Sequence, residues 1–132
     1  MTRRLYTLLL WLALPVVLIR RGWRALSSPG YRGRISERFG GGAPDDRCCD
    51  LWIHAVSVGE VKAATPLVQR LLKEKKHLNI IITTMTPTGA QQVVDTFGKE
   101  VRHRFAPYDY PFAIRRFINQ FSPRLLILME TE

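Results

Sequence analysis

LWIHAVSVGEVKAATPLVQRLLKEKKHLNIIITT, residues 51–84, holds the strongest secondary-structure signals of the chain. It begins with a short apolar run at residues 51–56 and ends with a second one at residues 79–84. Between them, residues 60–76 carry apolar side chains three and four positions apart, which is the spacing of a helix with one buried face. The stretch therefore predicts a strand, a helix and a second strand.

The same alternation continues towards the end of the chain. Residues 88–97 predict a helix that Gly98 stops, and residues 101–106 predict a third, less buried strand. A further helix is expected at residues 111–120, followed by an apolar strand, RLLILM, at residues 124–129. Apolar strands that alternate with helices predict an α/β fold, in which a Rossmann-like parallel sheet is covered on both faces.

A different pattern occupies the N-terminus, where the apolar run LYTLLLWLALPVVLI (residues 5–19) is flanked by arginines on both sides. We expect residues 1–26 to form a hydrophobic anchor helix. A helix that crosses a bilayer needs about 20 apolar residues, so both spanning and lying in the interface stay open. Two alternatives are a cleaved signal peptide and a buried helix. No small-residue cleavage site follows the run, and its dense arginine flanks disfavour a buried helix.

Charge is distributed unevenly between this segment and the rest of the chain. The net charge is +9, yet residues 1–40 hold eight arginines against the single acid Glu37, and the remainder is nearly balanced. Residues 27–50 are rich in Gly, Pro, Ser and charge and predict an exposed basic linker, with a possible short helix at residues 35–39. Anionic lipid is expected to attract Arg20, Arg21, Arg24, Arg32, Arg34 and Arg38, on the cytoplasmic side of the membrane.

Ligands of open parallel sheets bind at the edge where the strands end. Four loops are expected there, at residues 57–60, 85–89, 107–111 and 130–132. The cysteine pair at positions 48 and 49 lies elsewhere and lacks the spacing of a zinc site. The candidate chemistry therefore lies in the loops.

Glu60 is the main catalytic candidate of the first loop. A carboxylate at this edge could take a proton from a sugar hydroxyl as the hydroxyl attacks an electrophile. A structural reading competes with this one, because Ser57 and Glu60 also have the spacing of a capping box, in which the glutamate bonds back to the cap amide.

The second loop, TTMTPTGA, offers hydroxyl groups, a glycine and a helix N-terminus, all suited to a phosphate or a sugar oxygen. An ordinary N-cap at Thr86, with Pro87 as the first helical residue, explains most of this pattern. His54 and His103 lie within predicted strands without a nucleophile placed to use them, and we interpret both as structural.

Taken together, PGYRGRISERFG, LWIHAVSVGEVKAATPLV, IITTMTPTGAQQV, PYDYP and PRLLILMETE resemble the N-terminal part of bacterial transferases of 3-deoxy-D-manno-octulosonic acid (Kdo). The resemblance covers essentially the whole chain. It implies one half of a two-domain, metal-independent, inverting glycosyltransferase of the GT-B type. CMP-Kdo would be the donor, bound mainly by a second domain that this sequence lacks, and no cofactor is expected.

The resemblance also implies the roles of individual residues. Residues 51–132 would bind the acceptor, the glucosamine disaccharide of the lipid A precursor, at the cytoplasmic face of the inner membrane. Glu60 would be the general base, and the acceptor-binding residues would be Ser57, Gly59, Thr86, Thr88, Gly89, Glu130 and Glu132.

One alternative from another class is a non-catalytic, membrane-tethered module that binds anionic lipid or nucleic acid. Nucleic acid is not an expected partner, because the basic excess lies beside the anchor and not on the globular domain.

Overall fold

The computed structural model describes residues 3–27, 34–42 and 48–130. Four strands form one sheet in the order β3-β2-β1-β4, and every neighbouring pair is parallel. The strands are β1 (Leu51–Ala55), β2 (Ile80–Thr84), β3 (Arg102–Phe105) and β4 (Leu125–Met129). The helices are α1 (Arg3–Ser27), η1 (Ile35–Phe39), α3 (Val58–Glu74), α4 (Pro87–Phe97) and α5 (Pro111–Phe121). The predicted α/β fold with a parallel sheet is confirmed.

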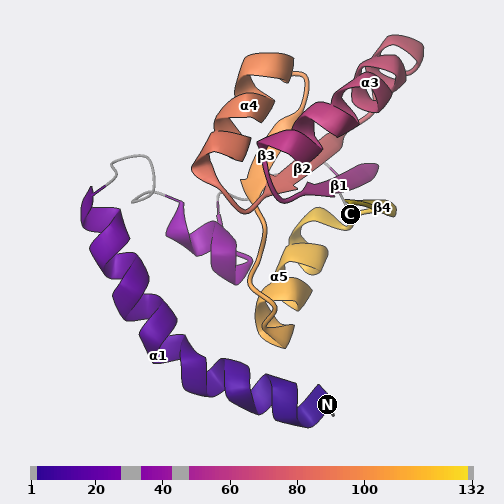
Figure 1. The fold of residues 1–132 in the computed structure, drawn as a ribbon. Coiled ribbons are helices and arrows are strands. Elements are labelled where there is room, and N and C mark those ends of the chain that lie inside the picture. Colours follow the sequence, from indigo (N-terminus) through magenta and orange to yellow (C-terminus); the bar gives the residue numbers. More distant parts are fainter. Residues whose placement is uncertain (1–2, 28–33, 43–47, 131–132) are drawn as a thin grey trace.

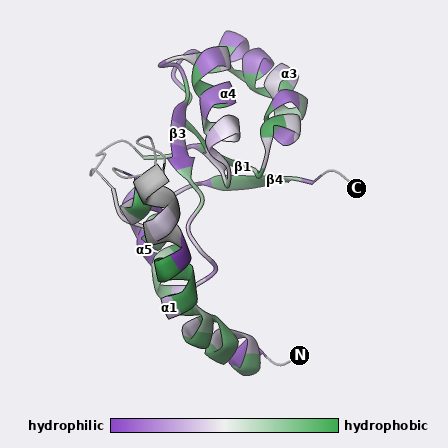
Figure 2. Cartoon of the chain, turned by 60° about the vertical axis from the view of Figure 1, so that its left-hand side comes forward, coloured by the Kyte–Doolittle hydropathy of each residue, from purple (hydrophilic) through white to green (hydrophobic). Residues whose placement is uncertain are grey.

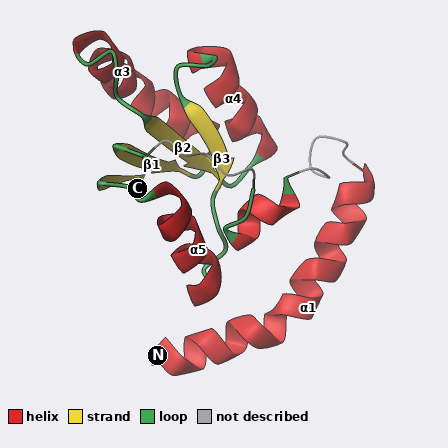
Figure 3. Ribbon diagram, turned by 180° about the vertical axis from the view of Figure 1, so that it is seen from behind, coloured by secondary structure: helices red, strands yellow, loops and turns green. Residues whose placement is uncertain are grey.

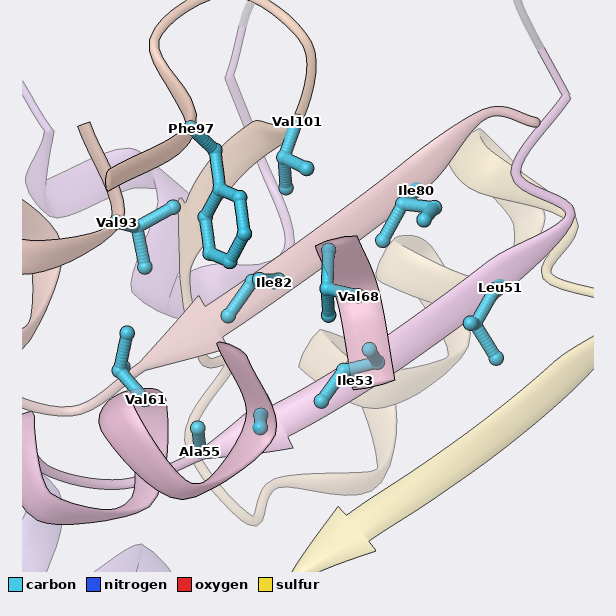
Figure 4. Packing of buried hydrophobic residues seen from close by; sticks show 11 residues of the cluster. Leu51, Ile53, Ala55, Val61, Val68, Ile80, Ile82, Val93, Phe97 and Val101 are labelled. Carbon is cyan, nitrogen blue, oxygen red and sulfur yellow. The ribbon is translucent and has the colours of Figure 1, made fainter. Parts of the chain in front are cut away.

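Helices α3 and α4 cover one face of the sheet, and α5 lies on the other (Figures 1 and 3). Alternate residues of β1 point to the two faces, as the pleat of a strand requires. Ile53 and Ile82 belong to the cluster beneath α3 and α4, together with Val61, Val68 and Val93 (Figure 4). On the opposite face, Trp52 and Ile81 pack with Phe117 and Phe121 of α5.

The two edge strands are less covered than the two central ones. All five residues of β2 are buried, whereas Leu125 and Leu128 of β4 are 59% and 62% exposed. The expectation of a sheet covered on both faces is therefore met only in part at β4: Ile127 and Met129 pack against the cluster beneath α3 and α4, whereas Leu126 and Leu128, on the other face, are exposed.

Helix α1 forms over the predicted apolar run, and Figure 2 shows it coloured as largely hydrophobic. Its apolar side chains are not buried by the described residues: Leu12 is 66% exposed and Ile19 is 72% exposed. In the described parts of the chain, no helix combines the length and apolar character that a membrane crossing requires. The alternative of a buried helix is not observed here, and the anchoring role stays a prediction.

The predicted exposed linker is wrong for the segment around η1. Glu37 and Arg38 are buried, at 6% and 1% exposure. Gly40 follows them with a φ of +73°, and a Cβ placed there would lie 2.2 Å from the carbonyl oxygen of Ala113. The segment is therefore packed closely against α5, and Arg38 cannot reach lipid. The expected lipid contact is therefore wrong for Arg38. Arg34 is paired with Glu37 but is 33% exposed, and its contact with lipid stays a prediction.

Candidate active site

The C-terminal ends of the strands bring the predicted loops together at one edge of the sheet. The amide of Met85, after β2, donates to the carbonyl of Val56, after β1, at 3.0 Å. The amide of Ala106, after β3, donates to the carbonyl of Thr84 at 2.9 Å. The N-termini of α3 and α4 therefore begin side by side, as the parallel sheet predicts.

Glu60 lies at this edge, in the first turn of α3, with its side chain mostly buried. The backbone amide of Val56 donates to its Oε2 at 2.5 Å, and the Ser57 hydroxyl lies 3.5 Å from its Oε1. A carboxylate offers about four acceptor positions, so these two contacts leave capacity for a further proton donor. The carboxylate is thus held against the end of β1.

This arrangement corrects the capping-box reading. That reading places the bond at the amide of Ser57, the N-cap of α3, whereas the structure places it at Val56, one residue earlier. The carbonyl of Val56 already accepts a hydrogen bond from Met85. The hydrogen bond from the Val56 amide to Glu60 therefore gives both backbone groups of Val56 a partner at the end of the strand. Glu60 therefore links α3 to the strand end.

The second loop contains the predicted N-cap. Thr86 accepts a hydrogen bond from the amide of Gly89 at 3.1 Å, and Pro87 is the first helical residue of α4. A Cβ at Gly89 would lie 3.0 Å from Thr86 Oγ1 and 3.2 Å from Thr84 Cβ, so glycine permits a close approach of helix to strand. Thr88, by contrast, is exposed at the edge.

The remaining predicted site residues differ in their surroundings. Gly59 is exposed, and a Cβ there would meet only the Ser57 hydroxyl, at 3.9 Å. Glu130 is exposed directly after β4, on the neighbour of β1, while Glu132 lies outside the described residues. None of these geometries tests the proposed contacts with an acceptor, which stay predictions.

Both histidines have the structural contacts expected of them. His103 Nδ1 accepts from the guanidinium of Arg34 at 2.8 Å, so its Nε2 carries the proton and donates to Thr84 Oγ1 at 2.8 Å. Burial is the main cause that lowers the pKa of His103 from 6.5 to about 3, and neighbouring guanidinium groups add to it. Burial likewise lowers the pKa of His54, whose Nδ1 lies 2.9 Å from Thr83 Oγ1.

We expect the free energy of unfolding to decrease by about 2 kcal/mol between about pH 7.5 and pH 5, measured by urea denaturation. The unfolded chain binds a proton at His103 below pH 6.5, whereas the folded chain does not until about pH 3. The stability that the neutral ring contributes is therefore complete well above pH 6.5 and declines as the pH falls through 6.5 towards the folded-state pKa. His103→Gln should remove most of this dependence, and His77→Gln, at an exposed histidine, should leave it in place. A wild-type stability that is equal at pH 7 and pH 5 would contradict the assignment.

Comparison with known proteins identifies the family. Residues 33–132 match the family model described as 3-deoxy-D-manno-octulosonic-acid transferase. The chain belongs to the Kdo transferase family. It is 48% identical to the 3-deoxy-D-manno-octulosonic acid transferase of Haemophilus influenzae over 100% of this chain and 31% of that relative. The transferase of Bordetella pertussis is 37% identical, over 100% of this chain and 32% of that protein.

A plant relative matches as well. The probable mitochondrial 3-deoxy-D-manno-octulosonic acid transferase of Arabidopsis thaliana is 35% identical over 98% of this chain and 29% of its own length. The chain thus spans about a third of the length of the curated relatives it matches. The resemblance to the N-terminal part of Kdo transferases is confirmed.

In this Kdo transferase chain, helix α1 approaches the same edge as the candidate site. The hydroxyl of Tyr110 donates to the carbonyl of Leu10 at 2.8 Å, and Tyr6 donates to Asp109. Trp11 packs edge-on against Tyr110, with ring centroids 6.0 Å apart. A groove of about 970 Å³ between α1, α5 and the sheet reaches Val56 and Met85, among a mostly apolar lining. The PYDYP loop therefore holds α1 beside the candidate site.

Sequence reasoning missed the contribution of η1 to this edge. Arg38 donates to the carbonyl of Met85 at 2.6 Å, and the amide of Tyr108 donates to the carbonyl of Arg38 at 2.7 Å. Glu37 accepts from the amide of Phe105 at 2.8 Å. The spacing of Arg34 and Glu37, three residues apart on a possible short helix, was the available signal for an ordered element. The Gly-, Pro- and Ser-rich composition of the surrounding segment predicted an exposed linker and outweighed this signal.

Proposed function

We propose that this chain is the acceptor-side part of a glycosyltransferase that transfers Kdo from CMP-Kdo to the glucosamine disaccharide of the lipid A precursor. Membership in the Kdo transferase family is the observation that carries the proposal. The reaction is inverting and independent of metal, and the fold of the whole enzyme is GT-B. The donor binds mainly to a second domain, in keeping with relatives about three times as long as this chain.

In this mechanism Glu60 is the general base. It removes the proton from the attacking hydroxyl of the glucosamine, the oxygen forms a bond to the anomeric carbon of Kdo, and CMP leaves. The carboxylate belongs to the edge where parallel sheets bind ligands, with acceptor capacity beyond its bonds to Val56 and Ser57. Gly59, Thr88 and Glu130 are exposed along the same edge and contact the acceptor, as do the half-buried Ser57 and Thr86. Gly89 is buried, so its part is to shape the turn that presents Thr86 and Thr88.

Helix α1 holds the domain at the cytoplasmic face of the inner membrane, where the acylated acceptor resides. Two features support this part of the proposal. The helix exposes large apolar side chains, among them Leu12, Val16 and Trp23. Tyr110 and Asp109 of the PYDYP loop are also hydrogen-bonded to Leu10 and Tyr6 of this helix, so the helix and the loop that follows β3 are joined.

The proposal is tested by transfer from CMP-Kdo to a radiolabelled lipid A precursor. We expect the full-length transferase that carries this chain to form the Kdo-modified product, with and without a metal chelator. The 132-residue chain alone is expected to form none. Turnover by the chain alone would refute its assignment to the acceptor side. Absence of product with the full-length protein, combined with retained binding to anionic vesicles, would favour the non-catalytic module.

A further inference from the structure

The segment from Arg34 to Gly41, here called the η1 clasp, lies against two of the loops that form the candidate site. Its contacts with Met85 and Tyr108 join it to the loops that follow β2 and β3. The contact between Glu37 and the amide of Phe105 fixes it to the end of β3. The clasp therefore contacts the edge of the sheet where the candidate site lies, through its buried side chains and its backbone.

Arg38 is the central residue of the clasp, and its side chain is 1% exposed. Its guanidinium carbon lies 4.5 Å from the ring centre of Phe105 and 5.7 Å from that of Tyr108. Two of its nitrogens reach Met85, one at the carbonyl oxygen and one at the sulfur, at 2.6 and 3.3 Å. A planar guanidinium suits this site better than an ammonium, because it stacks on rings and donates in several directions at once.

A chain of hydrogen bonds leads from Arg38 to Glu60. Arg38 donates to the carbonyl of Met85. The amide of Met85 donates to the carbonyl of Val56 at 3.0 Å, and the amide of Val56 donates to the Glu60 carboxylate at 2.5 Å. Each residue along this path is hydrogen-bonded to the next. Displacement of Met85 would therefore move the residue that orients the carboxylate.

We propose that Arg38 is a positioning residue, which sets the orientation of the Glu60 carboxylate through Met85 and Val56. This inference rests on the proposed function of Glu60 as a base and adds a residue to it. Arg38 does not touch the substrate. Its effect on transfer depends on Glu60. This dependence distinguishes Arg38 from a residue that only stabilises the fold.

The test is a double-mutant cycle in the full-length transferase that carries this chain. We expect Arg38→Lys to lower kcat/KM for Kdo transfer by about tenfold when Glu60 is present. In the Glu60→Gln background the same change should lower kcat/KM by less than about twofold, since there is no base left to orient. An equal reduction in both backgrounds would overturn the proposal, because a loss of folded protein multiplies both rates alike.

A second measurement does not depend on activity. Hydrogen exchange at the amides of Val56 and Met85 should become at least about tenfold faster in Arg38→Met, while exchange in the interior of β2 stays unchanged. If Arg38→Met does not fold, Arg38→Lys serves for this measurement. Arg70→Gln is the matched control, because Arg70 is 80% exposed and pairs only with Glu74 among the ion pairs described.

The two readouts separate the possible failures. Unchanged exchange at both amides would overturn the link between Arg38 and Glu60, whatever the enzyme does. Absence of transfer by the wild-type enzyme, together with accelerated exchange in the variant, would overturn the proposed function and leave the structural link in place.

Discussion

Glu60→Gln is expected to lower the rate of Kdo transfer by about 10³-fold in the full-length enzyme, because general-base catalysis contributes about 10²- to 10⁴-fold. Glutamine keeps an oxygen that can accept from the amide of Val56, so the link to the end of β1 survives. It cannot take a proton from a hydroxyl at neutral pH. The loss should therefore appear in the rate of transfer, measured with radiolabelled acceptor, and not in the thermal stability.

Two comparisons make this result decisive. Glu74→Gln changes another carboxylate of α3, which is exposed at the far end of the helix, and should leave transfer unchanged. Glu60→Ala should lose stability as well as activity, because the amide of Val56 then has no side-chain acceptor. Normal transfer by Glu60→Gln would reduce the role of Glu60 to the structural link that the coordinates show.

Gly40→Ala is expected to destabilise the protein by about 3 kcal/mol, from left-handed backbone strain and from overpacking. Gly40 has a φ of +73°, and the added Cβ would lie 2.2 Å from the Ala113 carbonyl oxygen and 3.0 Å from the Phe117 amide. Both atoms belong to the backbone of α5 and cannot move without shifting the helix. Urea denaturation with wild type and variant side by side measures the difference.

Gly59→Ala is the matched control for this change. Gly59 lies in the first turn of α3, and its added Cβ would have no neighbour nearer than 3.9 Å. Alanine is a better helix former than glycine, so stability should stay level or rise. An equally stable Gly40→Ala variant would show that η1 does not pack against α5 as described.

The elements of the globular domain were predictable because their signals are local. Residues 51–56 and 79–84 are apolar runs of strand length, and the observed strands lie within them as Leu51–Ala55 and Ile80–Thr84. The N-cap at Thr86 was also readable, since a threonine followed by proline has a strong preference for that position. Such preferences act within a few residues and need no knowledge of distant contacts.

The site was predictable to the extent that topology dictates it. A parallel sheet places the ends of all its strands at one edge, so Glu60 and Thr86 had to begin neighbouring helices there. The partner of the Glu60 carboxylate was predicted one residue away from its observed position. The capping box is a statistical pattern of sequence spacing. Which amide donates to the carboxylate depends on the direction in which the chain leaves β1, and spacing does not specify that direction.

The order of strands and helices, the parallel sheet and the family were all predictable from the amino-acid sequence, because the spacing of apolar residues and the order of the motifs are local properties of the chain. Only the tertiary structure showed that Arg38 is buried against Phe105 and Met85 and that Glu37 is bonded to β3. Arginines in a Gly- and Pro-rich segment have the composition of an exposed linker. Their burial depends on rings and backbone groups of residues about fifty to seventy positions away. No local sequence pattern predicts these long-range contacts.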